Sequence, residues 1–226
     1  MEALKHGGVA NRAAIHIKWV DSETVTDENA PAIFQDVQGI LVPGGFGGRG
    51  IEGKISAIRY ARQQNIPFLG LCLGMQMAIV EFARHVIGFS DAHTAELDPE
   101  TEHPVIHLMP EQNGIEDIGG TLRLGSYPCV LDPTSKAFKV YGQETIHERH
   151  RHRYEVNNDY RRDLTEHGMK LCGLSPDGRI VEMVELPDHP WFIATQAHPE
   201  FKSRPNRPHP LFSGFIRAAI EYGKKD

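Results

Sequence analysis

Cysteine is scarce in this chain. There are only 3 among 226 residues, and an odd, small number argues against a framework of disulfide bonds. Free thiols persist in reducing compartments. We therefore expect a cytoplasmic protein whose fold is held together by its core.

Long hydrophobic runs are also lacking. No segment approaches the roughly 20 apolar residues of a membrane-spanning helix, and the first residues, MEALKHGG, lack the apolar stretch of a signal peptide. Positive charge is in deficit, with a net charge of -6. We therefore expect neither a membrane partner nor a nucleic-acid partner.

What the sequence does contain is an alternation of short apolar segments with segments of helical periodicity. This alternation predicts an α/β fold of the flavodoxin-like or Rossmann-like type, with a mainly parallel sheet flanked by helices. The less regular middle predicts a small antiparallel portion. Strands are expected at 14–20, 39–42, 66–71, 105–108, 121–124, 129–131, 170–174, 180–186 and 191–196, and helices at 50–64, 74–86 and 211–222.

The N-terminal segment predicts an unusual start. Residues 2–6 are typical of the last turn of a helix, with Gly7 or Gly8 as its C-cap. A doubly wound domain usually begins with a strand before its first helix. We therefore expect this chain to be a fragment of a longer protein, with the opening strand of the domain missing.

One cysteine has a setting that suggests chemistry. Cys72 lies in GLCLG (70–74), between a predicted buried strand and a predicted helix, which is the cysteine form of the nucleophile elbow. The positive end of the following helix favours thiolate, the nucleophilic form, and the amide of Leu73 is placed to stabilise an oxyanion. Cys129 and Cys172 lack this setting and are interpreted as core or surface residues.

A second glycine-rich segment, PGGFGGRG (43–50), also follows a predicted strand and precedes a predicted helix. It lacks the Gly-Lys-Ser/Thr of a P-loop and fits the dinucleotide pattern poorly. A plain tight turn would explain the glycines. Beside a cysteine elbow, backbone amides that bind an anion are the better interpretation, and Gly45 is the candidate second oxyanion donor.

A histidine with a nearby carboxylate follows the last predicted strand. His198 and Glu200 lie in AHPE (197–200), and groups at the carboxyl ends of strands meet at one edge of an open α/β sheet. His198 can move the proton of a thiol to a leaving amine. Glu200 can hold its imidazole in one tautomer.

Arginine and histidine alternate in RHRHR (149–153). In a strand, a period of two places the arginines on one face and the imidazoles on the other. A solvated edge strand, nucleic-acid binding and metal binding are alternatives, but the chain is acidic overall and no ligand cluster is evident. No metal site is predicted.

Together these motifs resemble the class I glutamine amidotransferase family, and within it the glutaminase domain of CTP synthases. The resemblance covers essentially the whole chain, so residues 1–226 are expected to form one such domain. Ala197 departs from the family pattern, which has an aromatic residue before the histidine. The motifs that carry the resemblance are GGFGGRG (44–50), GLCLGMQ (70–76), ERHRHRYEVN (148–157), HPWF (189–192) and HPEF (198–201).

The resemblance implies roles for individual residues. Cys72 is similar to the nucleophile that forms a glutamyl thioester, His198 to its base and Glu200 to the residue that orients the base. Three sets of residues resemble those that contact glutamine: Gly45 through its backbone; Leu73, Gly74, Met75 and Gln76 as the pocket lining; and Glu96 and Arg153 at the α-amino and α-carboxylate groups.

The resemblance also implies partners. The domain itself would bind L-glutamine and need no cofactor. Its ammonia would pass to a synthetase domain, absent from this sequence, that uses ATP and Mg²⁺ to convert UTP to CTP. GTP is a possible effector, and the intact enzyme is expected to be a homo-oligomer.

Two other functions stay open on the residues alone. One is a different cysteine hydrolase of the same fold, such as a γ-glutamyl hydrolase, although the basic string and the Glu96/Arg153 pair argue against it. The other is a non-catalytic remnant that only binds a synthetase domain, although the intact triad argues against decay of the site.

Overall fold

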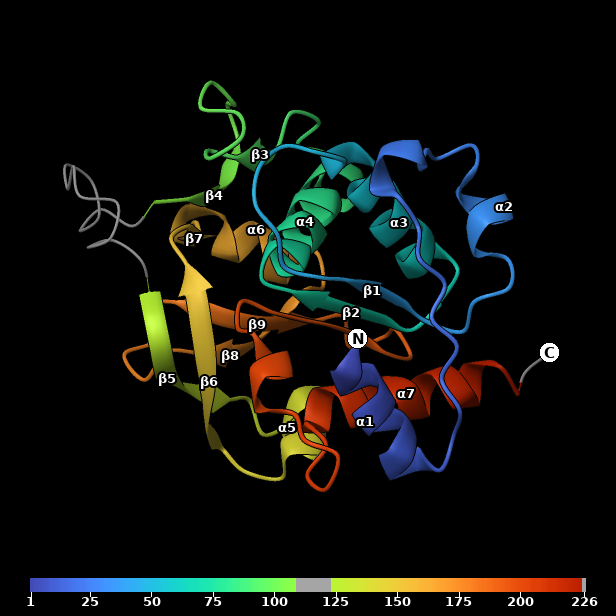
Figure 1. The fold of residues 1–226 in the computed structure, drawn as a ribbon. Helices are drawn as coiled ribbons and strands as arrows, with labels where there is room; N and C mark the ends of the chain where they lie inside the picture. Colours follow the sequence, from blue (N-terminus) through green and yellow to red (C-terminus); the bar gives the residue numbers. More distant parts are fainter. Residues whose placement is uncertain (109–122, 225–226) are drawn as a thin grey trace.

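A seven-stranded sheet forms the centre of the computed structural model, which describes residues 1–108 and 123–224 (Figure 1). Helices cover both faces, which confirms the predicted α/β class. In spatial order the strands are β1 (Ile40–Val42), β2 (Phe68–Leu71), β10 (Phe192–Thr195), β9 (Val181–Glu185), β8 (Lys170–Leu174), β5 (Arg123–Leu131) and β6 (Thr145–His152).

The balance of strand directions differs from the prediction. β1, β2 and β10 pair in parallel, whereas every pairing from β10 through β9, β8 and β5 to β6 is antiparallel. Antiparallel neighbours need only a short turn, while parallel strands need a crossover connection. The antiparallel portion is therefore larger than expected, because the chain from β8 to β9 returns directly at Ser175–Ile180.

Two apolar cores lie on opposite sides of the sheet. In β2, Phe68 packs into one core and the next residue, Leu69, into the other, and both are fully buried. Strands buried on both faces have continuous apolar sequences, which is why 66–71 was recognisable. One face carries α2 (Ala30–Phe34), α3 (Ile51–Gln63) and α4 (Leu73–Phe82), and the other carries α1 (Glu2–Asn11), α5 (Lys136–Tyr141) and α7 (Pro210–Tyr222) (Figure 1).

A second, three-stranded sheet lies beside α4. In the order β3–β4–β7, its strands pair parallel and then antiparallel. The helix predicted over 74–86 changes character, because α4 passes into a π-helical turn at η2 (Ala83–Ile87). The remaining elements are β3 (His93–Thr94), β4 (Pro104–His107), β7 (Glu155–Val156), α6 (Arg161–Glu166), and the 3₁₀ turns η1 (Ser22–Thr24), η5 (Asn158–Tyr160) and η6 (Pro199–Lys202).

The strand predicted at 14–20 was wrong. Ile15 and Ile17 are half-buried and their neighbours exposed, so the alternation is real, but the backbone joins no ladder among the described residues. Lys18 instead binds the Ile33 carbonyl (2.8 Å) and Asp36 (2.7 Å). Alternation predicts an extended segment, whereas a strand also needs a neighbour for its hydrogen bonds.

The predicted end of the first helix was also wrong. α1 continues through Gly7 and Gly8 to Asn11 and is capped by Arg12, which has φ 54°. A Cβ on Gly7 would lie 2.8 Å from the carbonyl oxygen of Phe212 in α7, and one on Gly8 would lie 2.6 Å from Ile15 Cγ1. The two glycines therefore allow close packing instead of capping the helix.

β5 and β6 form a long hairpin at the sheet's other edge. Residues 123–124 and 129–131 of the two predicted segments belong to the single strand β5, and Thr121 and Leu122 lie outside the described residues. The register runs from Arg123 opposite His152 to Val130 opposite Thr145. This hairpin brings the basic string to the edge where β10 ends.

Candidate active site

Cys72 occupies a sharp turn between β2 and α4. Its φ of 51° and ψ of -105° are unusual for a residue with a side chain, and such strain is typical of a functional position. The turn is held by backbone bonds on both sides. The Cys72 N–H donates to the Thr195 carbonyl (2.8 Å), and its own carbonyl accepts from Met75 (3.0 Å) and Gln76 (3.2 Å).

The two glycines of the elbow are required by close packing. A Cβ on Gly74 would lie 2.1 Å from the carbonyl oxygen of Val42 in β1. A Cβ on Gly70 would lie 2.8 Å from the Gly74 oxygen and 2.9 Å from the Ala194 Cβ in β10. The start of α4 is therefore wedged between two neighbouring strands, which holds the cysteine at their carboxyl ends.

His198 follows β10 at the same edge. Its backbone N–H donates to the Arg149 carbonyl of β6 (2.7 Å), and its Nδ1 donates to Oε1 of Glu200 (2.7 Å). A carboxylate can only accept, so Nδ1 carries a proton, and when the ring is neutral Nε2 is left as the base. Nε2 is buried and makes no hydrogen bond of standard geometry with a described residue.

The thiol and the imidazole are neighbours. Hydrogen bonding to Cys72 and to Glu200 raises the pKa of His198 to about 9 against the opposing effect of burial. A Cβ on Gly44 would lie 2.8 Å from His198 Cε1 and 3.4 Å from Cys72 Cβ. The glycine loop therefore closes a third side of a small space that contains both reactive groups.

The two residues predicted to supply oxyanion donors, Leu73 and Gly45, lie close to each other. The first N–H groups of a helix have no partner within it, and Leu73 is the first residue of α4. A Cβ on Gly45 would lie 3.4 Å from Cδ2 of Leu73. The structure thus brings the glycine loop and the helix start together, while the donor role of Gly45 stays a prediction.

The other residues predicted to line the glutamine pocket, Gly74, Met75 and Gln76, are all buried. The Met75 side chain is fully buried in an apolar core, so this residue can offer a ligand only its backbone. Gln76 is buried as well, and its Nε2 donates to the Tyr154 carbonyl (3.3 Å). Gly74 offers no side chain and is buried against β1.

Glu96 and Arg153 are close enough to interact. Packing around the Glu96 carboxyl raises its pKa, and the positive charge of Arg153 acts in the opposite direction, although much of Glu96 remains exposed. Nε of Arg153 is buried without a hydrogen-bond partner in the described part of the chain. Unlike Arg149 and Arg151, Arg153 lies in the bend after β6.

Comparison with known proteins identifies the family. Residues 1–218 match the family described as glutamine amidotransferase class-I. The chain is 60% identical to the CTP synthase of Geobacillus kaustophilus (strain HTA426), with 98% of this chain covered. It is 37% identical to the solved "Trypanosoma brucei CTPS - glutaminase domain with bound acivicin", with a TM-score of 0.92 and coverage of 97% of this chain and 86% of that one. The chain belongs to the class I glutamine amidotransferases, in their CTP synthase branch.

This amidotransferase domain corresponds to part of its curated relatives. It spans 42% of the Geobacillus protein and 41% of the CTP synthase of Staphylococcus aureus (strain JH9), to which it is 61% identical over 98% of this chain. A solved glutamine amidotransferase from Methylobacillus flagellatus shares the fold, with a TM-score of 0.55 at 12% identity and coverage of 98% of this chain and 87% of that one.

Two neighbours of Cys72 and His198 were not predicted. Gln196 is fully buried, and its Nε2 donates to Sγ of Cys72 at 3.7 Å. Phe201, half-exposed, stacks on the His198 ring with 5.3 Å between centroids and 24° between planes. Both flank the His-Pro-Glu segment, so proximity in the sequence was the available indication.

The basic string follows the predicted period of two. Along β6, Arg149 and Arg151 are exposed while His150 and His152 are buried. Burial lowers the pKa of His150 to about 3 and that of His152 well below its usual value. Within residues 1–108 and 123–224, no group of three or more His, Cys, Asp or Glu is arranged to hold a metal ion.

Behind these imidazoles lies a buried ionic cluster. Arg123 binds Glu182 (2.7 Å) and Glu155 (3.2 Å), and His150 lies 2.8 Å from His152 between their ring nitrogens. Burial raises the pKa of Glu155 to about 8, and burial also raises that of Glu182. The cluster is electrostatically coupled to His198 through both imidazoles.

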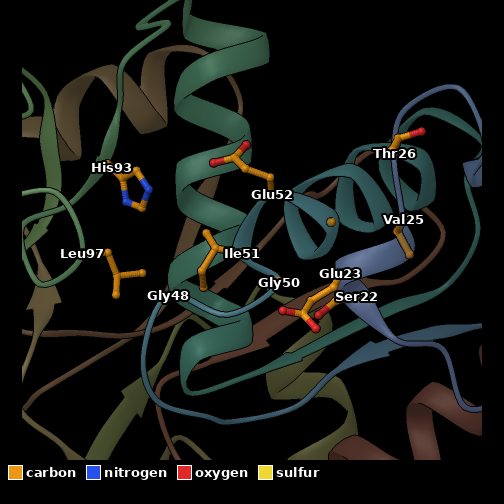
Figure 2. A pocket seen from close by; sticks show the side chains of 11 residues that line it. Ser22, Glu23, Val25, Thr26, Gly48, Gly50, Ile51, Glu52, His93 and Leu97 are labelled. Atoms are coloured by element: carbon orange, nitrogen blue, oxygen red, sulfur yellow. The ribbon is translucent and has the colours of Figure 1, made fainter.

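One cavity in the described part of the amidotransferase domain lies apart from Cys72 and His198. It measures about 600 Å³ and is lined by η1, the start of α3, His93 and Leu97 (Figure 2). Its carboxylates are already paired, Glu23 with Arg49 (2.7 Å) and Glu52 with Arg84 (2.9 Å). Neither Cys72 nor His198 lines this cavity.

Proposed function

We propose that this domain hydrolyses L-glutamine to glutamate and ammonia through a thioester on Cys72. The observation that carries the proposal is the triad geometry: a strained cysteine at the start of a helix, beside an imidazole that is hydrogen-bonded to a carboxylate. Acyl transfer needs a nucleophile, a proton carrier and a residue that orients the carrier.

In the first half of the reaction, Sγ of Cys72 attacks the side-chain amide carbon of glutamine. The C–S bond forms as the carbonyl electrons move to oxygen, where the amides of Leu73 and Gly45 stabilise the charge. One such donor contributes about 3 kcal/mol to similar reactions. His198, whose pKa is raised to about 9, holds the proton of the Cys72 thiol and gives it to the amide nitrogen as the C–N bond breaks and ammonia leaves.

In the second half, the deprotonated His198 takes a proton from water, which attacks the thioester. The C–S bond breaks, the thiolate of Cys72 is restored and glutamate leaves. Microscopic reversibility lets the same ring act first as acid and then as base. Arg153 and Glu96 hold the α-carboxylate and α-amino groups, since opposite charges complement a zwitterion and an arginine fits a carboxylate.

The proposed recipient of the ammonia is a synthetase domain of the CTP synthase kind, in a longer protein of which residues 1–226 form the glutaminase domain. That domain would use ATP and Mg²⁺ to aminate UTP to CTP, with GTP as effector and a homo-oligomer as the working form. The relatives named CTP synthase support this assignment. Three free cysteines favour the reducing cytoplasm, and the described residues form no helix that could span a bilayer.

The test is labelling with 6-diazo-5-oxo-norleucine, a glutamine analogue that alkylates the nucleophile, followed by peptide mapping. We expect one adduct on Cys72 and at least a 1,000-fold loss of glutaminase activity in Cys72→Ala, since nothing else replaces the nucleophile. Cys129→Ala, at a buried thiol in the other core, is the matched control and should keep its activity. Retained glutaminase activity in Cys72→Ala, or preference for γ-glutamyl peptides over glutamine, would refute the proposal.

A further inference from the structure

Gln196 contacts the predicted nucleophile directly. Its side chain is fully buried at the end of β10, and its Nε2 lies 3.7 Å from Sγ of Cys72. We propose that Gln196 is a positioning residue whose amide donates a hydrogen bond to the sulfur and holds it in place for attack. This inference rests on the proposed function, because it assigns a role in the same site.

The direction of this hydrogen bond follows from the neighbouring contacts. The carbonyl oxygen of Tyr154 can only accept, so Gln76 must turn its amino group toward it (3.3 Å). The same amino group lies 3.3 Å from the Gln196 side chain and therefore faces its oxygen, Oε1. Nε2 of Gln196 is consequently left to face the sulfur, so the amide orientation is imposed by the chain of contacts.

Both ends of the contact are anchored to the sheet. The Gln196 N–H donates to the Glu182 carbonyl of β9 (2.9 Å), and the Cys72 N–H donates to the carbonyl of Thr195 (2.8 Å). The nucleophile and its donor are thus held by adjacent residues of one strand end. Little conformational freedom remains to be lost when the bond forms, which favours a precise geometry.

The chemical effect is a preference for the charged sulfur. A hydrogen bond to an ionised acceptor is stronger than one to its neutral form, so a donor aimed at the sulfur favours thiolate over thiol. His198 is a titratable group in contact with Cys72, and it is in turn paired with Glu200. Gln196 adds a neutral donor that works at every pH.

The experiment measures alkylation of Cys72 by iodoacetamide against pH, with peptide mapping to separate this thiol from Cys129 and Cys172. Gln196→Met keeps the length of the side chain and removes the donor. We expect the pH at which the alkylation rate of this variant rises to be higher than in the wild type by about one pH unit. At pH values below this rise, alkylation should be about tenfold slower. Gln64→Met, at an exposed glutamine, is the matched control and should leave the profile unchanged.

A second variant covers the case in which Gln196→Met fails to fold. Gln196→Glu still accepts from Gln76 but presents an oxygen to the sulfur, so its carboxylate should move the rise in alkylation rate to a still higher pH. Thermal unfolding by circular dichroism identifies folded variants. A folded variant of either kind with the wild-type profile would overturn the role of Gln196, since a purely structural residue would change stability and leave the profile in place.

The reagent separates this inference from the proposed function. Iodoacetamide needs no glutamine pocket, so the profile tests Gln196 even if the wild-type domain hydrolyses no glutamine. In an active domain, Gln196→Met should lower kcat about tenfold at pH 7 with little change in KM, because the bond acts on the nucleophile and not on the substrate. An unchanged kcat in a folded Gln196→Met variant would also count against the assignment.

Discussion

Glu200 controls the ring of His198 through one hydrogen bond, between Nδ1 and Oε1 (2.7 Å). Glu200→Gln removes the charge that stabilises the imidazolium, so the pKa of His198 should fall from about 9 toward its ordinary value near 6.5. We expect kcat for glutamine to fall by about 100-fold or more. Steady-state kinetics and an NMR titration of His198 measure the two effects.

The control for this variant is Glu166→Gln, at an exposed carboxylate of α6 that pairs with Arg162. It should leave both kcat and the titration of His198 unchanged. A Glu200→Gln variant with wild-type kcat would show that the carboxylate does not orient the base.

Arg153 should determine affinity more than rate. Its Nε is buried without a hydrogen-bond partner among the described residues, which leaves a donor for a carboxylate ligand. Arg153→Met should raise KM for glutamine about tenfold or more, with a smaller effect on kcat. Arg162→Met, at an exposed arginine of α6, provides the comparison, and an equal KM in both variants would contradict the assignment.

At the scale of the element, the elbow depends on how closely α4 approaches β1. Gly74→Ala places a Cβ 2.1 Å from the Val42 carbonyl, and a backbone oxygen cannot move aside as a side chain can. We expect a loss of about 2–3 kcal/mol in the free energy of unfolding or a failure to fold. Chemical denaturation of the variant and the wild type measures the difference.

Gly48→Ala is the matched substitution in the glycine loop. Its Cβ would meet only Leu97 Cδ2, at the ordinary distance of 3.9 Å, and the residue is exposed. The free energy of unfolding should change by less than about 0.5 kcal/mol. Equal losses in the two variants would mean that glycine is needed in these loops for a reason other than close packing.

For the whole molecule, pH should act through groups whose pKa differs between the folded and unfolded states. The folded pKa is raised for Glu155, to about 8, and for His198, to about 9. The folded state then binds protons more tightly, so their stabilisation is lost as the pH rises through those values. For His150 and His152 the folded pKa is lowered, so they destabilise the fold only below about pH 6.5.

Above pH 6.5 the two imidazoles do not contribute to the pH dependence of stability. The thermal unfolding midpoint should therefore decrease as the pH is raised from 6.5 to 9. Glu155→Gln removes the titrating carboxyl, so the fall between pH 6.5 and 8 should shrink by an amount on the order of 5 °C. Calorimetry at a series of pH values measures it. Glu100→Gln, at an exposed position, should keep the wild-type slope, and an identical slope in Glu155→Gln would disprove the role of the cluster.

How far the sequence alone could lead depends on the kind of pattern. From residues 66–74 we could predict both a strand and the elbow at Cys72. A buried strand, two glycines and a cysteine are local features, and the structure contains them in β2, the turn and α4. HPE (198–200) was recognised for the same reason. Residues 14–20 show the limit of local patterns. Their burial alternates as predicted, but among the described residues they pair with no neighbouring strand.

The sequence by itself determined the buried strands at 39–42 and 66–71, the elbow at Cys72, the His198–Glu200 pair and the family, because each rests on short motifs of contiguous residues. Only the tertiary structure decided the contact of Gln196 with the sulfur, the burial of Arg123 between two carboxylates and the close packing at Gly7. These features join residues far apart in the chain or on different elements. Their energies depend on distance and burial, which no local pattern of residue types encodes.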